Sequence, residues 1–191
     1  MIKIYTNAEK AIEEVLERSF AAPDVYKTVG EIIADVRARG DEALFEYTEK
    51  FDKAKLTSLK VSKEEIEAAY NEVDSELIDI IKEAAENIRA YHIKQLRQGY
   101  EIKNGTITLG QKITPIEKVG LYVPGGTAAY PSTVLMNDIT DKIAGSEKIV
   151  IATPCDRNGT VKPAVLVAAD IAGVHEIYKI SGAQAIAALA F

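Results

Sequence analysis

The chain has 191 residues, 47% of them hydrophobic and 27% charged, a composition that supports a globular fold with a sizeable core. Its net charge of −6 lies within residues 1–110, residues 111–191 are neutral, and neither part combines a basic patch with interleaved aromatic side chains, so we expect no nucleic-acid partner. No apolar run approaches the roughly 18 residues of a membrane span, and the single cysteine, Cys155, excludes an internal disulfide, so we expect a cytoplasmic protein that acts away from membranes.

Residues 1–99 carry the periodicity of helices. Capping boxes, in which a Ser or Thr stands three residues before a Glu, predict two of the helix starts, and a Pro-Asp pair predicts another. Gly40 is placed to end the second helix as a left-handed cap. The helices predicted before residue 75 begin at Thr6, Asp24, Asp41 and Ser62, and the third of them ends near Phe51.

The longest predicted helix runs from about Ser75 to Arg97. Its apolar residues recur every three or four positions and form one stripe, which needs a second surface to cover it. The other helices or a second subunit could supply that surface, and the sequence does not distinguish the two. The stripe consists of Leu77, Ile80, Ile81, Ala84, Ala85, Ile88 and Tyr91.

From residue 100 the periodicity changes to that of strands. Residues 101–109 alternate around Asn104-Gly105, a strong signal for a β-hairpin. From Val119 onward short apolar strands alternate with helices, and strands this uniformly apolar predict a parallel sheet covered on both faces. The predicted strands are 119–123, 148–153 and 176–180, and the predicted helices between them are 134–144 and 161–172.

The predicted fold class is therefore α/β. We expect an N-terminal helical region, residues 1–99, and then residues 100–191 as a hairpin leading into an incomplete Rossmann-like parallel sheet with helices on both faces. The last predicted helix would expose Ile186, Leu189 and Phe191 without a neighbour. This pattern predicts a fragment of a longer protein, or a domain that a partner completes.

The loop after the first strand of this sheet, Pro124-Gly125-Gly126, is a candidate binding site. It follows a buried strand at its carboxyl end, where open α/β sheets bind ligands, and the next helix would direct its positive N-terminal end toward an anion. A plain strand-to-helix turn is the alternative. The Gly-x-Gly-x-x-Gly fingerprint of dinucleotide binding does not occur in the sequence.

Two polar side chains are expected near the same edge. Gln184 stands in the first turn of an otherwise apolar helix, where it could bind a ligand amide or ribose, or else face solvent or cap the helix. Tyr122 ends the first strand, and its ring could belong to the core or contact a ligand. The sequence pattern leaves both choices open.

Residues that could perform catalysis are not evident. Cys155 has no histidine nearby in sequence to activate it as a nucleophile, so a loop thiol is the better interpretation. His92 and His175 lie in different predicted elements, without a further ligand at metal-binding spacing. We therefore predict no catalytic residue and no metal ligand in this chain.

The segment 119–136, Val-Gly-Leu-Tyr-Val-Pro-Gly-Gly-Thr-Ala-Ala-Tyr-Pro-Ser-Thr-Val-Leu-Met, closely resembles a motif of the histidinol dehydrogenase family. Residues 29–44 with Phe51-Asp52 resemble the family's early helices, residues 84–92 its long helix, and residues 172–189 a strand-loop-helix unit. The resemblance covers essentially the whole chain. The combination of Tyr-Val-Pro-Gly-Gly with Gly-Ala-Gln-Ala-Ile-Ala-Ala-Leu is highly specific.

This resemblance implies an enzyme that uses NAD and zinc to oxidise L-histidinol through L-histidinaldehyde to L-histidine, at the end of histidine biosynthesis. It also implies a homodimer with incomplete nucleotide-binding folds. Tyr122 and Gln184 match residues of the family that contact the NAD cofactor, and Pro124, Gly125 and Gly126 would shape the same crevice. The family's zinc ligands, its Glu-His acid/base pair and its substrate-binding Ser, Gln and His fall after residue 191, so we expect the isolated chain to be inactive.

Two alternatives remain. A short non-catalytic binding or scaffold module could have the same fold, although such a module should cover or polarise its last helix. Another NAD-linked alcohol or aldehyde dehydrogenase would need a nucleophile further along the chain and a different substrate pocket.

Overall fold

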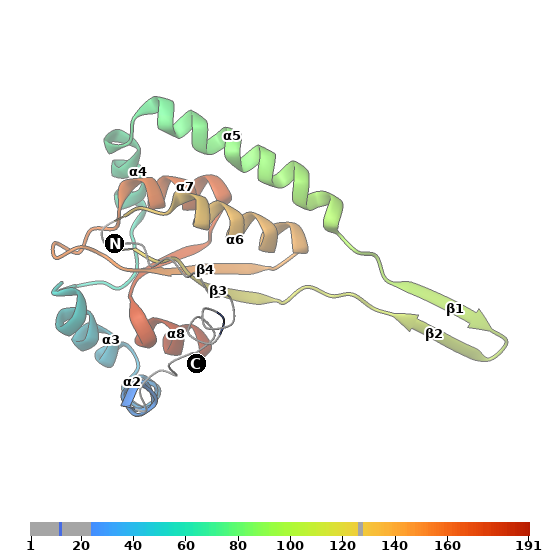
Figure 1. Ribbon diagram of the computed structural model, residues 1–191, viewed down its shortest axis with the longest axis horizontal. Coiled ribbons are helices and arrows are strands. Elements are labelled where there is room, and N and C mark those ends of the chain that lie inside the picture. Colours follow the sequence, from blue (N-terminus) through green and yellow to red (C-terminus); the bar gives the residue numbers. More distant parts are fainter. Residues whose placement is uncertain (1–11, 13–23, 126–127) are drawn as a thin grey trace. The chain divides into compact units, whose positions relative to one another are not determined.

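The computed structural model describes Ile12, residues 24–125 and residues 128–191. The chain divides into two compact units, Met1–Glu31 and Ile32–Phe191. Of the helix predicted from Thr6, the structure describes Ile12 alone, which is helical and exposed. In the second unit a three-stranded parallel sheet lies between layers of helices, which confirms the α/β fold class (Figure 1).

The sheet has the order β3-β4-β5. Its strands are β3 (Lys118–Tyr122), β4 (Lys148–Thr153) and β5 (Glu176–Lys179), and its helices are α6 (Pro131–Ala144), α7 (Pro163–Ala172) and α8 (Gly182–Ala190). α6 connects β3 to β4, α7 connects β4 to β5, and α8 follows β5. The predicted strands and helices are confirmed, with boundaries that move by three residues or fewer.

Helices cover both faces of the sheet because its strands are apolar on both sides (Figure 1). On one face, α6 packs against β3 and β4 and beside α7, around buried residues such as Ile139 and Ile151. On the other face, α8 packs against β3 and β4. Leu189 of α8 lies against Gly120 of β3, where an added Cβ would be 2.8 Å from Leu189 Cδ2. Leu189 is thus half-buried, contrary to the prediction, whereas Ile186 and Phe191 are exposed.

The earlier helices add outer layers. α2 spans Asp24–Arg39 and α3 spans Asp41–Tyr47, and α3 packs on α8. Gly40 between them has a φ of +57°, but its ψ of −130° lies outside the left-handed helical region, so the predicted cap geometry is wrong. The third helix also ends before Phe51, because the chain forms a π-helical turn, η1, over Thr48–Asp52.

α4 spans Lys63–Glu72 and α5 spans Ser75–His92, and they pack on α7 and α6. α5 is shorter than predicted because it tightens after His92 into a 3-10 turn, η2, over Ile93–Gln95. In its apolar stripe Ile81 and Ala85 are buried. Leu77, Ile80 and Tyr91 are exposed, so the other helices cover only part of the stripe.

The predicted hairpin is confirmed as β1 (Tyr100–Asn104) paired antiparallel with β2 (Ile107–Gln111). Its turn is shifted by one residue from the expected Asn-Gly, because Asn104 pairs with Ile107 and leaves Gly105 and Thr106 at the centre. Gly105 has a φ of +61° and Thr106 does not have a positive φ, the pattern of a type II′ turn with glycine first. Every residue of both strands is exposed.

Among the described helices, none is both long enough and apolar enough to cross a membrane.

Candidate functional site

The predicted site residues meet where the parallel strands end, around residues 122–125, 153–155 and 180–184; this region is termed the carboxyl edge. Tyr122 is half-buried at the end of β3. Its hydroxyl accepts a long hydrogen bond of 3.4 Å from the backbone N–H of Gly182, the first residue of α8. The fold therefore brings the two sequence motifs together.

Gln184 lies in the first turn of α8 and is 1% exposed, so the solvent-facing interpretation is wrong. Its side chain folds back toward the start of the helix, where a Cβ added to Gly182 would lie 3.0 Å from Gln184 Oε1. The Gln184 Nε2 atom has no hydrogen-bond partner within the described residues. A buried donor without a partner costs about 1–3 kcal/mol, and a ligand oxygen would satisfy it.

The glycine loop contributes to the same edge. Pro124 is exposed and Gly125 is half-buried, whereas Gly126 lies outside the described residues. A Cβ on Gly125 would lie 2.9 Å from Pro154 Cγ, so glycine is needed for the loops after β3 and β4 to approach this closely.

Cys155 lies half-buried in the loop after β4. Burial, with a smaller contribution from the Asp52 carboxylate, raises the pKa of the Cys155 thiol to about 11. The thiolate is therefore scarce at neutral pH, which argues against a nucleophilic role.

Asp52, at the end of η1, is a residue of this edge that the sequence patterns did not identify. It accepts a hydrogen bond of 2.6 Å from the hydroxyl of Ser181, the N-cap residue of α8. Burial raises the pKa of Asp52. The two residues are 129 positions apart, so no local periodicity could have predicted their contact.

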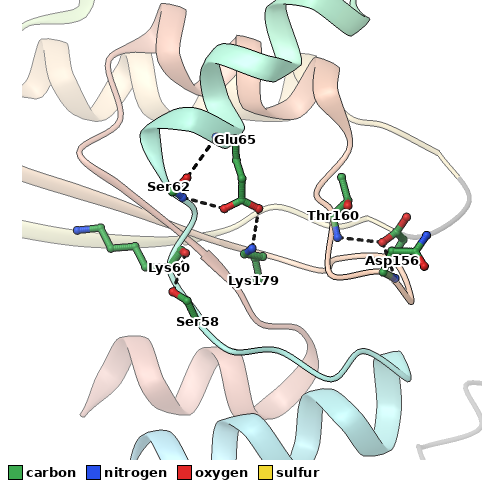
Figure 2. Close-up of polar contacts among 8 residues, drawn as sticks. Ser58, Lys60, Ser62, Glu65, Asp156, Thr160 and Lys179 are labelled. Atoms are coloured by element: carbon green, nitrogen blue, oxygen red, sulfur yellow. Dashed lines mark hydrogen bonds and ion pairs between the residues drawn. The ribbon is translucent and has the colours of Figure 1, made fainter.

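A part-buried ion pair between Lys179 and Glu65 supports the end of β5 (Figure 2). Lys179 is 8% exposed, and its Nζ lies 2.6 Å from Oε1 of Glu65. Glu65 also closes the capping box of α4: its backbone N–H donates to the Ser62 hydroxyl at 3.2 Å, and its carboxylate accepts from the Ser62 backbone N–H at 2.8 Å. The capping box is thus confirmed, and its glutamate also fixes the buried lysine.

The backbone around this ion pair is tied to the sheet. Leu59–Val61 runs antiparallel to β5, with the Lys179 N–H donating to Leu59 O at 2.7 Å and the Val61 N–H donating to Ile177 O at 2.9 Å. In the loop after β4, Asp156 Oδ1 accepts from the backbone N–H of Thr160 at 2.9 Å (Figure 2). It also accepts from the backbone N–H of Asn158 at 2.9 Å. Backbone pairing along β5 and the hydrogen bonds of Asp156 in the loop after β4 therefore fix two of the segments that form the carboxyl edge.

Neither histidine lies at the carboxyl edge. His175 is exposed before β5, where its Nδ1 accepts a hydrogen bond of 3.0 Å from the Ile149 backbone N–H. His92 contacts Gln95 through Nδ1 at 2.6 Å, at the end of α5. Over the described part of the chain, no three His, Cys, Asp or Glu side chains gather where they could hold a metal ion.

A hollow of about 840 Å³ lies near the opposite, amino ends of the strands. Lys60 and Lys148 at its rim each lie 3.0 Å from the carboxylate of Glu176, and hydrogen bonds from these lysines lower the pKa of Glu176 to about 2. The positive charges of Lys60 and Lys148 are therefore already paired with Glu176. Because open α/β sheets bind ligands at the carboxyl ends of their strands, the carboxyl edge remains the candidate site.

The parallel order β3-β4-β5, with helices on both faces, places the molecule in the class of Rossmann-like α/β proteins. Within that class the chain belongs to the histidinol dehydrogenase family, because the family model described as "Histidinol dehydrogenase" matches residues 16–191.

Individual relatives agree with this assignment. A histidinol dehydrogenase of Clostridium acetobutylicum is 51% identical over 187 residues, which are 97% of this chain and 43% of the relative. One of Bacillus subtilis is 50% identical over 194 residues, covering 100% of this chain and 44% of the relative. The crystal structure of histidinol dehydrogenase from Elizabethkingia anophelis matches with a TM-score of 0.87 and 38% identity, over 95% of this chain and 42% of that one. The chain thus spans less than half the length of these relatives.

Proposed function

We propose that this chain is the N-terminal part of an enzyme that oxidises L-histidinol through L-histidinaldehyde to L-histidine, the last steps of histidine biosynthesis. The family match and the partial coverage of relatives named histidinol dehydrogenase support this function. The observation that carries the role of this chain is the buried Nε2 of Gln184 beside the start of α8, which has no partner in the part of the chain that the structure describes.

The carboxyl edge is proposed to form one wall of the NAD site. Gln184 Nε2 and the first backbone N–H groups of α8 are donors suited to the oxygen atoms of a dinucleotide. Tyr122 lies beside them, and Pro124, Gly125 and Gly126 would border the same crevice. Two NAD molecules, bound one after the other, would each accept one hydride, one in each oxidation, and the residues of this chain would bind and orient them.

The remaining parts of the activity are also proposals. The zinc ligands, the acid/base pair and the substrate-binding residues would come from the part of the family's length that this chain does not span, so residues 1–191 alone would be inactive.

By the same resemblance the enzyme would be a homodimer, and Cys155 as the single cysteine suits a cytoplasmic location. The change of periodicity at Tyr100 supports a helical region over residues 1–99 and an α/β region over residues 100–191.

A chimera tests the proposal. Residues 1–191 of this chain would be joined to the part of the Bacillus subtilis relative that follows its matched region, and NADH formation would be measured with L-histidinol, NAD and zinc. The expected result is histidinol-dependent NADH formation by the chimera and none by residues 1–191 alone. A folded but inactive chimera would favour the non-catalytic module, and turnover by the chain alone would show that its catalytic residues were missed.

The contribution of Gln184 is tested in the same chimera. Gln184→Ala should raise the KM for NAD about tenfold, the effect of losing one good hydrogen bond, with a smaller change in kcat. Gln111→Ala, on the exposed hairpin, is the matched control and should leave both constants unchanged. An unchanged KM for NAD in Gln184→Ala would remove Gln184 from the site.

A further inference from the structure

Ser181 is the N-cap residue of α8 but does not cap it. Its backbone has the extended geometry of an N-cap, with φ −127° and ψ 172°, from which a serine hydroxyl normally accepts a hydrogen bond from the second or third N–H of the helix. No such side-chain bond is present. The hydroxyl instead donates to Asp52 Oδ2 at 2.6 Å.

As a result, the Ser181 hydroxyl does not cap the first backbone N–H groups of α8. Among the described residues, the backbone N–H of Gly182 has the Tyr122 hydroxyl as its one hydrogen-bond acceptor, at a long 3.4 Å. The carboxamide of Gln184, 1% exposed and with Nε2 unpartnered among the described residues, folds back over the same turn. The buried amide is the second, independent sign that an acceptor-rich group belongs at this position.

We propose that Asp52 is a positioning residue that keeps the start of α8 open for its ligand by holding the Ser181 hydroxyl away from the first helical amides. Without the Asp52 carboxylate, Ser181 would rotate and accept from the N–H of Ala183 or Gln184. The cap would then compete with the ligand for these donors. The identity of the ligand, the phosphate-bearing dinucleotide NAD, rests on the proposed function. The competition between the Asp52 carboxylate and the helix amides for the Ser181 hydroxyl does not.

The test is a double-substitution cycle with Asp52→Ala, Ser181→Ala and the combined variant. Amide hydrogen exchange of Ala183 and Gln184 is measured by NMR in the 191-residue chain. Asp52→Ala should slow exchange of at least one of these amides about fivefold, the usual strength of a serine cap, while Ser181→Ala and the combined variant should leave both amides as in the parent chain. Asp52→Asn, whose side-chain oxygen can still accept from Ser181, should resemble the parent.

The consequence for the ligand is measured as the KM for NAD in the chimera described above. Asp52→Ala should raise it about fivefold, Ser181→Ala should change it less than twofold, and the combined variant should return it to the parent value. Restoration by a second substitution separates this role from a structural one, since loss of a structural Asp52–Ser181 bond would affect both single variants and the combined variant equally.

Three results would overturn the inference. The first is an equal amide exchange rate in Asp52→Ala and the parent chain. The second is an equal rise of the KM for NAD in both single variants, and the third is a combined variant whose KM does not return to the parent value. An inactive chimera would instead defeat the proposed function, and the exchange rates of the four proteins would still decide whether Asp52 prevents capping.

Discussion

The sheet β3-β4-β5 and the β1–β2 hairpin are built from similar residues but are stabilised in different ways. In β4 the side chains of Ile151 and Ala152 point to opposite faces and both are 0% exposed, because helices cover both faces of the sheet. In the hairpin Ile102 and Leu109 form a cross-strand pair on one face, yet they are 58% and 64% exposed. Sequence periodicity predicts strands in both regions, but burial stabilises only the first.

The hairpin depends on its own ladder of hydrogen bonds and on its turn. Register places Tyr100, Ile102, Ile107 and Leu109 on one face and leaves Glu101, Lys103 and Thr108 on the other. A two-stranded hairpin without a covered face is marginal in water. The two regions should therefore respond differently to substitution. Substitutions in the sheet should change the free energy of global unfolding, and substitutions in the hairpin should change only the free energy of its local opening.

The largest effect is expected at the centre of β4. Ile151→Ala removes buried methyl and methylene groups from a side chain that is 0% exposed, and should lower the free energy of unfolding by about 2–5 kcal/mol. Urea titration of the purified chain measures it. The matched control, Ile102→Ala in the hairpin, should change this free energy by less than about 0.5 kcal/mol. Comparable losses in the two variants would contradict the contrast.

Asp138 in α6 is an unfavourable group in the core beside the sheet, because both of its carboxylate oxygens are buried and lack partners among the described residues. Burial, with a smaller contribution from Asp141, raises its pKa from the ordinary 3.8 to about 7. The folded state therefore holds a proton that the unfolded state has released, and stability should fall as pH rises from about 4 to 7 and then level off.

Asp138→Asn should remove this pH dependence. The rise of about three pKa units corresponds to about 4 kcal/mol at pH 8, at about 1.4 kcal/mol per unit. The new amide would have no partner among the described residues, at a cost of about 1–3 kcal/mol, so the net gain at pH 8 should be about 1–3 kcal/mol. Chemical unfolding at pH 5 and pH 8 measures the change, with the exposed Asp79→Asn as control. A parent chain equally stable at both values would show that Asp138 has a partner in solution.

A smaller and local effect is expected at the hairpin turn. Gly105→Ala places a Cβ on a residue with φ +61° and should destabilise the turn by about 1 kcal/mol. Amide exchange in β1 and β2 should accelerate, while the urea midpoint of the chain stays the same. A shifted midpoint would mean that the hairpin unfolds together with the sheet.

The smallest effect is expected on the apolar face of the hairpin. Leu109→Ser changes a side chain that is 64% exposed and should alter the free energy of unfolding by less than about 0.5 kcal/mol. Chemical denaturation and size-exclusion chromatography of the variant, compared with the parent, provide the measurement. A loss above about 1 kcal/mol, or a change in oligomeric state, would show that another surface covers this face in solution.

Local patterns predicted the elements well. The apolar strands and the helices between them are where periodicity placed them, and the Ser62–Glu65 capping box forms as its spacing indicates. Errors occur where a local signal competes with pairing or packing. The hairpin turn is centred one residue later than the Asn-Gly dipeptide indicated, because strand register selected Gly105 and Thr106. η1 and η2 shorten two helices whose polar-apolar patterns continue.

The candidate site was predictable in part. Tyr122 and Gln184 are predicted as cofactor contacts from a family resemblance and from their positions at strand and helix ends, but the neighbours of Gln184 in the sequence do not show whether it faces solvent. Helical spacing does indicate the burial of Asp138, because it stands four and three residues after the buried Val134 and Leu135, on the apolar side of α6. Asp52 and Lys179 lie in segments that resemble the family, but no local pattern indicated a role for either side chain.

The amino-acid sequence by itself determined the helices, the strands, the parallel sheet and the family, because hydrophobic periodicity and motif order are properties of neighbouring residues. Only the tertiary structure decided which polar groups meet. The Ser181–Asp52 hydrogen bond, the Lys179–Glu65 ion pair and the burial of Gln184 Nε2 without a partner among the described residues all depend on how η1, α4 and α8 pack around the end of β5. Contacts across more than 100 residues arise from that packing, and no local pattern encodes them.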